Sequence, residues 1–275
     1  MKTITADPSK LGPVRDPAGG YSGQAVLSKV PAVSIFFWIM KICATTLGET
    51  AGDLVSMTLK VGYAVSSMIL IGIFIVALLG QLASKRFHPT LYWTVILATS
   101  TAGTTMSDYM DRTLNLGYAT GSTILVCCLA AILLLWRLTE GTISVDHIRT
   151  KRAELFYWFA ILCSNTLGTA LGDYLADSSG LGFLGGAALI GGLIGLTVLA
   201  HYFTRISGVI LFWIAFVLTR PFGATFGDLM TKPVSKGGFN LGTTGSSLVL
   251  VALLVLLISY TIKRDKRLSG APLPS

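Results

Sequence analysis

Four aspartates stand at a fixed distance from an aromatic–tryptophan pair in this chain of 275 residues. In every copy a glycine follows the tryptophan by ten residues and the aspartate follows it by fifteen. The four sets are Trp38–Gly48–Asp53, Trp93–Gly103–Asp108, Trp158–Gly168–Asp173 and Trp213–Gly223–Asp228. This constant spacing indicates an internal repeat. Because the repeat falls in long uncharged segments, the carboxylates are candidates for an ion path, a proton path or paired charges.

Each aspartate ends a polar stripe on one face of a predicted helix. At 100° per residue, the side chains 7, 8, 11, 14, 15 and 18 positions after the tryptophan share one sector. If four such helices turn their stripes inward, the aspartates meet at one depth, where a cation or protons would offset their repulsion. Threonine and carboxylate oxygens suit a hard cation such as Mg²⁺, Mn²⁺ or Ca²⁺. The predicted metal ligands are Asp53, Asp108, Asp173 and Asp228, and the wider ion-binding set adds Glu49, Thr45, Thr46, Thr104 and Thr169.

Two charged residues break the fourfold pattern. Glu49 stands where the other copies have Thr104, Thr169 and Ala224. It is the best candidate for a proton-titrating or ion-coupling group. Arg220 is a basic residue near mid-depth, and it either pairs with Glu49 or an aspartate, or acts in gating.

Other interpretations of the aspartates stay open. Each could hydrogen-bond the backbone of the turn that follows it, as a structural clasp in a non-catalytic scaffold or partner protein. An intramembrane aspartyl protease is a further alternative, although four equivalent aspartates do not favour an enzyme. Carboxylate separations of about 4–8 Å would favour a shared ion, given ligand distances near 2–2.6 Å.

Composition indicates an all-α polytopic integral membrane protein. Hydrophobic residues make up 52% of the chain, charged residues 12%, and the mean hydropathy is +0.71. Eight transmembrane helices are predicted near residues 33–57, 62–83, 90–110, 117–137, 154–176, 181–203, 207–230 and 241–262. Fifteen of the 21 Lys and Arg residues fall on the side of both termini and four on the opposite side. This imbalance predicts an inner (plasma) membrane protein with both termini cytoplasmic, so the net charge of +8 reports topology and not nucleic-acid binding.

The eight spans group into four parallel two-helix repeats arranged in two halves. The predicted parts are a disordered cytoplasmic tail (1–30), half 1 with repeats 1 and 2 (31–137), a cytoplasmic linker (138–153), half 2 with repeats 3 and 4 (154–262) and a cytoplasmic tail (263–275). The even spans open with glycine and a small residue four further on, which suits close helix packing, with a hinge as the alternative. The repeated tryptophans are interpreted as interfacial anchors, with a cytoplasmic constriction as the alternative.

The segment Trp38…Gly48-Glu49-Thr50-Ala51-Gly52-Asp53 resembles a family of bacterial membrane proteins catalogued as uncharacterised membrane-anchored proteins. The resemblance covers residues 31–262 and implies no activity. A fainter likeness is to manganese/calcium–proton exchangers with a Glu-x-Gly-Asp hallmark, from which this chain departs because two residues separate Glu49 from Gly52 and Leu54 replaces a basic residue. The expected function is a transporter for a small hard cation, with proton coupling as one form. The expected partners are membrane lipid and the cation, without a resident cofactor.

Overall fold

The described part of the chain folds into eight long α-helices joined by short connections. The computed structural model describes residues 30–84, 87–148 and 150–268, and no strand occurs in those ranges. The helices are α1 (Ile35–Asp53), α2 (Tyr63–Ala83), α3 (Pro89–Asp108), α4 (Tyr118–Glu140), α5 (Lys151–Asp173), α6 (Gly182–Phe203), α7 (Gly208–Thr231) and α8 (Thr243–Leu268). A π-helical turn directly follows three of them: η2 (Leu54–Thr58), η3 (Tyr109–Thr113) and η5 (Tyr174–Ser178). The remaining elements of the described ranges are two 3₁₀ segments, η4 (Val145–His147) and η6 (Val234–Lys236).

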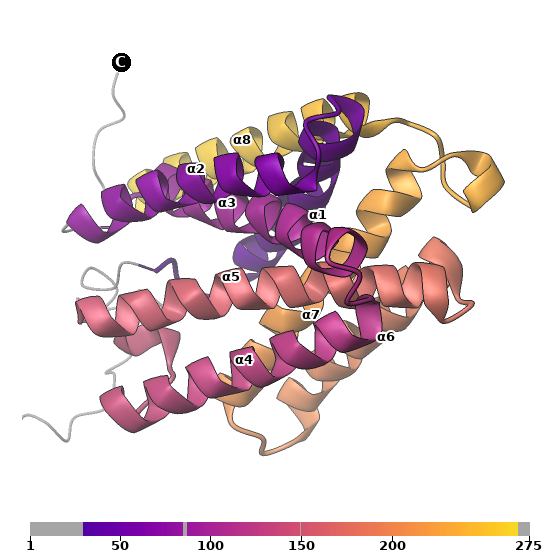
Figure 1. Cartoon of the computed structure of the whole chain (residues 1–275). Coiled ribbons are helices and arrows are strands. Elements are labelled where there is room, and N and C mark those ends of the chain that lie inside the picture. The colour runs from indigo at the N-terminus through magenta and orange to yellow at the C-terminus, as the bar shows by residue number, and fades with distance from the viewer. Residues whose placement is uncertain (1–29, 85–86, 149, 269–275) are drawn as a thin grey trace, which may run out of the picture.

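The first helices of the four repeats form a closed inner ring. In this ring α1 packs on α3, α3 on α5, α5 on α7, and α7 returns to α1. The second helices lie outside it, with α2 on α3, α4 on α5, α6 on α7 and α8 on α1 (Figure 1). Each second helix therefore packs mainly on the first helix of the next repeat. We call α1, α3, α5 and α7 the ring helices and the other four the outer helices.

The outer helices are the most apolar part of the fold and also the most exposed. Among the residues that the structure describes, six helices are long and apolar enough to cross a membrane: α2, α4, α5, α6, α7 and α8. In α5 and α7, 67% and 61% of the most apolar 18-residue segment is buried inside the protein, against 22–28% in the four outer helices. Large apolar surfaces left exposed on the outside mark contact with a partner or a bilayer. Their distribution over all four outer helices indicates a membrane protein.

Six of the eight predicted spans coincide with helices that are long and apolar enough to cross a membrane. The other two, α1 and α3, are ring helices of 19 and 20 residues with polar side chains over much of their surface. Lys41 and Glu49 are buried in α1, and six Thr or Ser residues are buried in α3. Because neighbouring helices enclose them, these two ring helices need no continuous apolar surface of their own.

The repeated glycine at position ten is a packing residue of the ring. A Cβ atom on any of the four would come within 3 Å of the next ring helix, a distance that requires the neighbour to move. The nearest atoms are Ser100 Oγ (2.3 Å) for Gly48, Thr166 N (2.9 Å) for Gly103, Arg220 Cγ (2.3 Å) for Gly168 and Thr45 Oγ1 (2.6 Å) for Gly223. The glycines therefore let adjacent ring helices approach one another closely.

The glycine at the start of each outer helix allows the backbone conformation of the turn before that helix. Gly62, Gly117, Gly182 and Gly242 have φ between +66° and +82°, where glycine is favoured, and a Cβ there would meet nothing within 4 Å. Their interpretation as helix-packing residues is therefore wrong. Close packing belongs to the small residue four positions on, since Ser66 and Ser246 are 0% and 2% exposed.

Some predicted segment boundaries differ from the helix bounds of the structure, and some predicted segments include residues that the structure does not describe. Of the predicted tail 1–30, residues 1–29 lie outside the described residues, as do residues 269–275. Within the predicted tail 263–275, α8 continues to Leu268. The linker is shorter than 138–153, because α4 ends at Glu140 and α5 begins at Lys151. Val145 and Ile148 of this linker are buried, so it packs against the bundle.

Candidate functional site

The four repeated aspartates are buried in two pairs, and each pair is bridged by a basic residue. Arg112 contacts Asp108 (Nε–Oδ1, 3.0 Å) and Asp173 (Nη2–Oδ2, 2.9 Å). Lys232 contacts Asp228 (Nζ–Oδ1, 3.0 Å) and Asp53 (Nζ–Oδ2, 2.7 Å). All four aspartates are 2–3% exposed. The predicted convergence thus takes the form of two ion-paired clusters at the C-terminal end of the ring helices, which we call the acidic end.

The two clusters follow an approximate twofold arrangement. Arg112 and Lys232 each lie four residues after their own aspartate, in repeats 2 and 4. Each also reaches the aspartate of the following repeat, repeat 3 for Arg112 and repeat 1 for Lys232. Repeats 1 and 3 have Met57 and Asp177 at the same position, so they supply no bridging cation of their own. The sequence alone presents Arg112 and Lys232 as loop charges; the four-residue spacing is the feature that could have identified them.

The clasp interpretation has no hydrogen bond to support it. Among the described residues, none of the four aspartates accepts a hydrogen bond from the backbone of its own turn. Backbone groups close the turns instead, as where Gly62 N donates to Ser56 O at 3.0 Å and Gly117 N donates to Asp111 O at 3.3 Å. The aspartates therefore connect neighbouring repeats through basic side chains.

Glu49 and Arg220 form a buried ion pair inside the ring, which is one of the two roles predicted for Arg220. Both Arg220 Nη1 and Nη2 lie 3.0 Å from Glu49 Oε2, and the two side chains are 3% and 0% exposed. The Thr104 and Thr169 hydroxyls donate to the same Oε2 atom at 3.3 and 3.4 Å and also contact Arg220 Nη2. Two of the predicted neutral oxygens therefore belong to this cluster. The buried Arg220 Nε has no hydrogen-bond partner.

Thr45 and Thr46, which the sequence predicts as ion ligands, have hydroxyls that contact backbone carbonyl groups. Their hydroxyls donate to Ile42 O at 3.0 and 2.9 Å, and the Thr45 hydroxyl lies 3.1 Å from Thr219 O on α7. These are contacts within and between ring helices. Of the predicted threonines, only Thr104 and Thr169 contact a carboxylate.

Three carboxylates lie close enough together to share one ion. One oxygen from each of Glu49, Asp53 and Asp228 falls within 4.8 Å of the other two. Two ligands on opposite sides of a cation bound at about 2.0–2.6 Å are about 4–5 Å apart, so this spacing fits one hard cation. Asp228 Oδ1 is buried without a hydrogen bond, although Lys232 Nζ is 3.0 Å away. We call Glu49, Asp53 and Asp228 the three-carboxylate cluster.

Lys232 supplies the positive charge next to this cluster. Burial lowers the pKa of Lys232, but the charges of Asp228 and Asp53 outweigh that effect and raise it above the ordinary value for lysine. Lys232 is therefore an ammonium at neutral pH. Its side chain remains 22% exposed at the surface of the acidic end.

Comparison with protein-family models matches the four repeats to the family described as Repeat of Unknown Function (DUF347). The matched segments are residues 36–87, 91–142, 156–207 and 211–267. The chain belongs to this repeat family. No curated protein matches the chain, and no solved structure matches it. The family model bears out the fourfold repeat and assigns no chemistry to it.

The aromatic pairs of the DUF347 repeats close the opposite end of the ring. Trp93, Trp158 and Trp213 are only 2%, 1% and 5% exposed, so their interpretation as interfacial anchors is wrong. The aromatic residue before each tryptophan packs against the tryptophan of the next repeat. The ring centroids are 5.8 Å apart for Phe37–Trp93, 5.5 Å for Tyr92–Trp158, 6.4 Å for Tyr157–Trp213 and 5.7 Å for Phe212–Trp38. A layer of eight aromatic rings thus packs at this end, which we call the aromatic end, and the cytoplasmic constriction stays a prediction.

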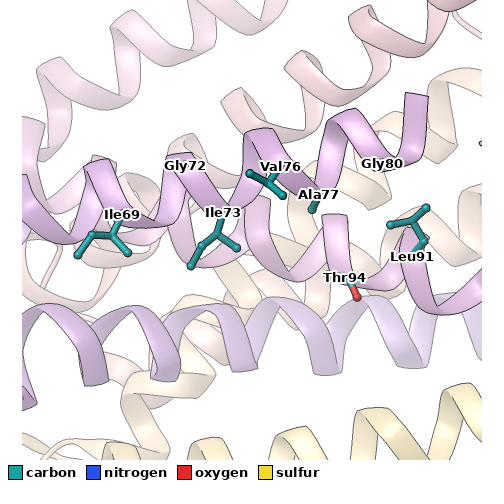
Figure 2. A pocket seen from close by; sticks show the side chains of 8 residues that line it. All are labelled: Ile69, Gly72, Ile73, Val76, Ala77, Gly80, Leu91 and Thr94. Atoms are coloured by element: carbon teal, nitrogen blue, oxygen red, sulfur yellow. The ribbon is translucent and has the colours of Figure 1, made fainter. Parts of the chain in front are cut away.

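A separate groove on the outside of the DUF347 fold has different chemistry. It has a volume of about 660 Å³ and lies between α2 and α3 (Figure 2). Its lining is almost entirely apolar and includes Ile69, Ile73 and Val76, which are 49%, 51% and 71% exposed. No repeated acidic residue reaches this groove. It suits contact with lipid chains, and the candidate ion site is the three-carboxylate cluster inside the ring.

Proposed function

We propose that this protein is a membrane transporter for a small hard cation of the Mn²⁺, Mg²⁺ or Ca²⁺ type, coupled to protons. The observation that carries this proposal is the three-carboxylate cluster, because buried carboxylates with a common spacing are the usual ligands of such ions. Thr104 and Thr169 lie beside Glu49 and add neutral oxygens next to the cluster.

The cation binds in place of the Lys232 ammonium. Lys232 contacts two of the three carboxylates, and it is the most exposed member of its ion-paired cluster. When its side chain moves into water, Asp53 and Asp228 are left with unpaired negative charge. A metal ion that then binds all three carboxylates replaces one positive charge with two, at a site that already favours cations.

The second ion-paired cluster is unsuited to the same role. Asp108 and Asp173 share Arg112, but the residue in repeat 3 that corresponds to Glu49 is Thr169. This cluster thus has two carboxylates where the other has three. The Arg112 guanidinium also bridges its partners with two different nitrogen atoms, a rigid arrangement that a point charge lacks. Arg112 serves as a fixed connection between repeats 2 and 3.

The proposed location is the inner membrane, with both termini in the cytoplasm. The excess of Lys and Arg on the side of the termini supports this orientation. The acidic end then faces the outside of the cell and the aromatic end faces the cytoplasm. Lys232 closes the outer entrance to the three-carboxylate cluster, and the aromatic layer closes the inner one.

A protease function is less well supported by the same geometry. Aspartyl proteases need two carboxylates that share a proton. Here each aspartate pair has a basic side chain between its members, which favours two ionised carboxylates instead.

Uptake into liposomes tests the proposal. Purified protein is reconstituted with an internal dye that reports Mn²⁺, Mg²⁺ or Ca²⁺, and the ion is added outside with a pH difference across the bilayer. We expect uptake by the wild type and its loss in the Asp53→Asn/Asp228→Asn variant. Asp177→Asn, which changes an exposed acid in a neighbouring turn, is the matched control. If Asp→Asn at all four repeated positions leaves the flux unchanged, cation transport through this site is refuted.

A further inference from the structure

Lys41 is a buried lysine that the cation site does not use. It lies on α1 eight residues before Glu49, towards the aromatic end, and it is 0% exposed. Its Nζ atom is 3.5 Å from Asn165 Oδ1 and 4.0 Å from the centre of the Phe216 ring. An ammonium has three N–H donors, so an amide oxygen at the limit of hydrogen bonding and a ring face satisfy it only in part. At this depth, an ionised lysine is ordinarily paired with an acid.

The groups around Lys41 provide no such acid. From α7 the facing charge is Arg220, which repels an ammonium at Lys41. From α5 comes the neutral Asn165 amide, whose nitrogen donates to the Thr99 hydroxyl of α3 at 2.9 Å. From α8 the Leu250 carbonyl contacts Cys43 Sγ. Within the described ranges, no helix packed on α1 brings a carboxylate within 4 Å of Lys41 Nζ.

Entry of a divalent cation changes the charge in the ring that contains Lys41. The ion pairs of the ring together with Lys41 hold four basic and five acidic side chains: Lys41, Arg112, Arg220, Lys232, Glu49, Asp53, Asp108, Asp173 and Asp228. A divalent cation that takes the place of Lys232 adds one positive charge to this set, and a further buried positive charge is costly beside an ammonium. Loss of one proton from Lys41 removes that charge.

We propose that Lys41 is the proton-releasing residue of this protein, giving up its proton when a divalent cation occupies the three-carboxylate cluster and regaining it when the cation leaves. The inference rests on the proposed cation transport and names its coupling residue. The Lys41 N–H bond breaks, its electron pair stays on Nζ as a neutral amine, and the proton passes to water. Arg220 cannot substitute, because a guanidinium keeps its proton in proteins.

Two variants of Lys41 separate a proton-transfer role from a structural one. Lys41→Arg keeps the positive charge but cannot release a proton, and Lys41→Met removes the charge. In liposomes we expect both to lose pH-driven cation uptake by about a hundredfold, the scale of a missing proton-transfer group. We expect cation counterflow at equal pH to continue in Lys41→Met, because counterflow needs no net proton movement, and to be lost in Lys41→Arg, because its permanent charge opposes cation binding. Lys60→Met, at an exposed turn position, should leave both activities unchanged.

Each outcome of this comparison is decisive. Loss of pH-driven uptake in both variants, with counterflow retained in Lys41→Met, supports the proton role. Retained pH-driven uptake in either variant overturns it, as does loss of counterflow in folded Lys41→Met. If the wild type moves no cation in either assay, the cation-transport proposal fails, and the proton role is then decided by a spectroscopic measurement.

That measurement is the ¹⁵N NMR spectrum of lysine-labelled protein in detergent, with the Lys41 signal assigned by its absence in Lys41→Arg. We expect this signal to change from ammonium to amine at a pH below that of ordinary lysine. Addition of Mg²⁺ or Ca²⁺ should move the change to lower pH. An ammonium signal up to the pH at which exposed lysines titrate, with and without the ion, overturns the proposal whatever the transport assay gives.

Discussion

Removal of one partner of the Glu49–Arg220 pair should destabilise the protein far more than removal of both. The pair is fully enclosed, with exposures of 3% and 0%, and Arg220 Nη1 and Nη2 both contact the same carboxylate oxygen. In Glu49→Gln the guanidinium stays buried without an acid. Breaking such a pair costs about 3–5 kcal/mol, because an uncompensated charge remains in the interior.

The double variant Glu49→Gln/Arg220→Met should recover most of that loss. With both charges gone, the site holds an amide and a thioether, and Thr104 and Thr169 still offer hydroxyls to the Gln side chain. Replacement of a whole buried pair by residues of similar size is often close to neutral in stability. We therefore expect a coupling free energy of about 3 kcal/mol between the two positions.

Thermal unfolding in detergent, followed by tryptophan fluorescence, measures all four members of this cycle. At about 2–4 °C per kcal/mol for a chain of this size, Glu49→Gln should lower Tm by about 6–20 °C. Asp177→Asn, at an exposed position, is the matched control and should leave Tm nearly unchanged. If the two single changes are additive, with the double variant the least stable, the two residues do not act as a pair and the interpretation of this site is refuted.

The remaining predictions concern the ring, the outer entrance and the aromatic end. Gly48→Ala should cost about 1–3 kcal/mol of unfolding free energy because its Cβ meets Ser100, whereas Gly192→Ala, in open space on α6, should be neutral or stabilising in the same unfolding assay. Lys232→Met should lower Tm by a constant amount between pH 6 and about 9. Because the pKa of Lys232 is raised in the folded protein, its contribution to stability is complete below the pKa of about 10.4 for unfolded lysine, and the difference in Tm should shrink only at higher pH. A difference in Tm that already shrinks near pH 7 would show that Lys232 is not held by Asp228 and Asp53. Tyr92→Phe should cost about 1 kcal/mol, because it removes the 2.6 Å hydrogen bond between the Tyr92 and Tyr157 hydroxyls, and an unchanged Tm would argue against that contact.

Periodicity predicted the parts of this structure that depend on a single helix. The spacing of Trp38, Gly48 and Asp53 identified the repeat. The polar stripes that contain Glu49 on α1 and Thr104 on α3 indicated which face of each helix turns into the ring. Both inferences work because an α-helix places residues on its faces at a fixed angle per residue. The Glu49–Arg220 contact was also within reach, since each residue is the odd member of its stripe.

The contacts between different repeats could not be predicted from helix periodicity. No periodicity shows that α8 packs on α1, or that Lys232 reaches Asp53 across 179 residues of sequence. The tryptophans were misassigned for a related reason. A Trp near the end of an apolar span is ordinarily an interfacial anchor, but here the closed ring turns each one onto the aromatic residue of the repeat before it.

Equilibrium binding of Mn²⁺ to the purified protein, followed by electron paramagnetic resonance, tests the central claim most directly. We predict saturable binding by the wild type, tighter binding by Lys232→Met, and its loss in Asp53→Asn/Asp228→Asn. The matched Asp108→Asn/Asp173→Asn variant should still bind the ion, because its change lies in the other ion-paired cluster. Absence of saturable binding in both the wild type and Lys232→Met, or equal loss in the two double variants, would contradict the assignment of the three-carboxylate cluster as the cation site.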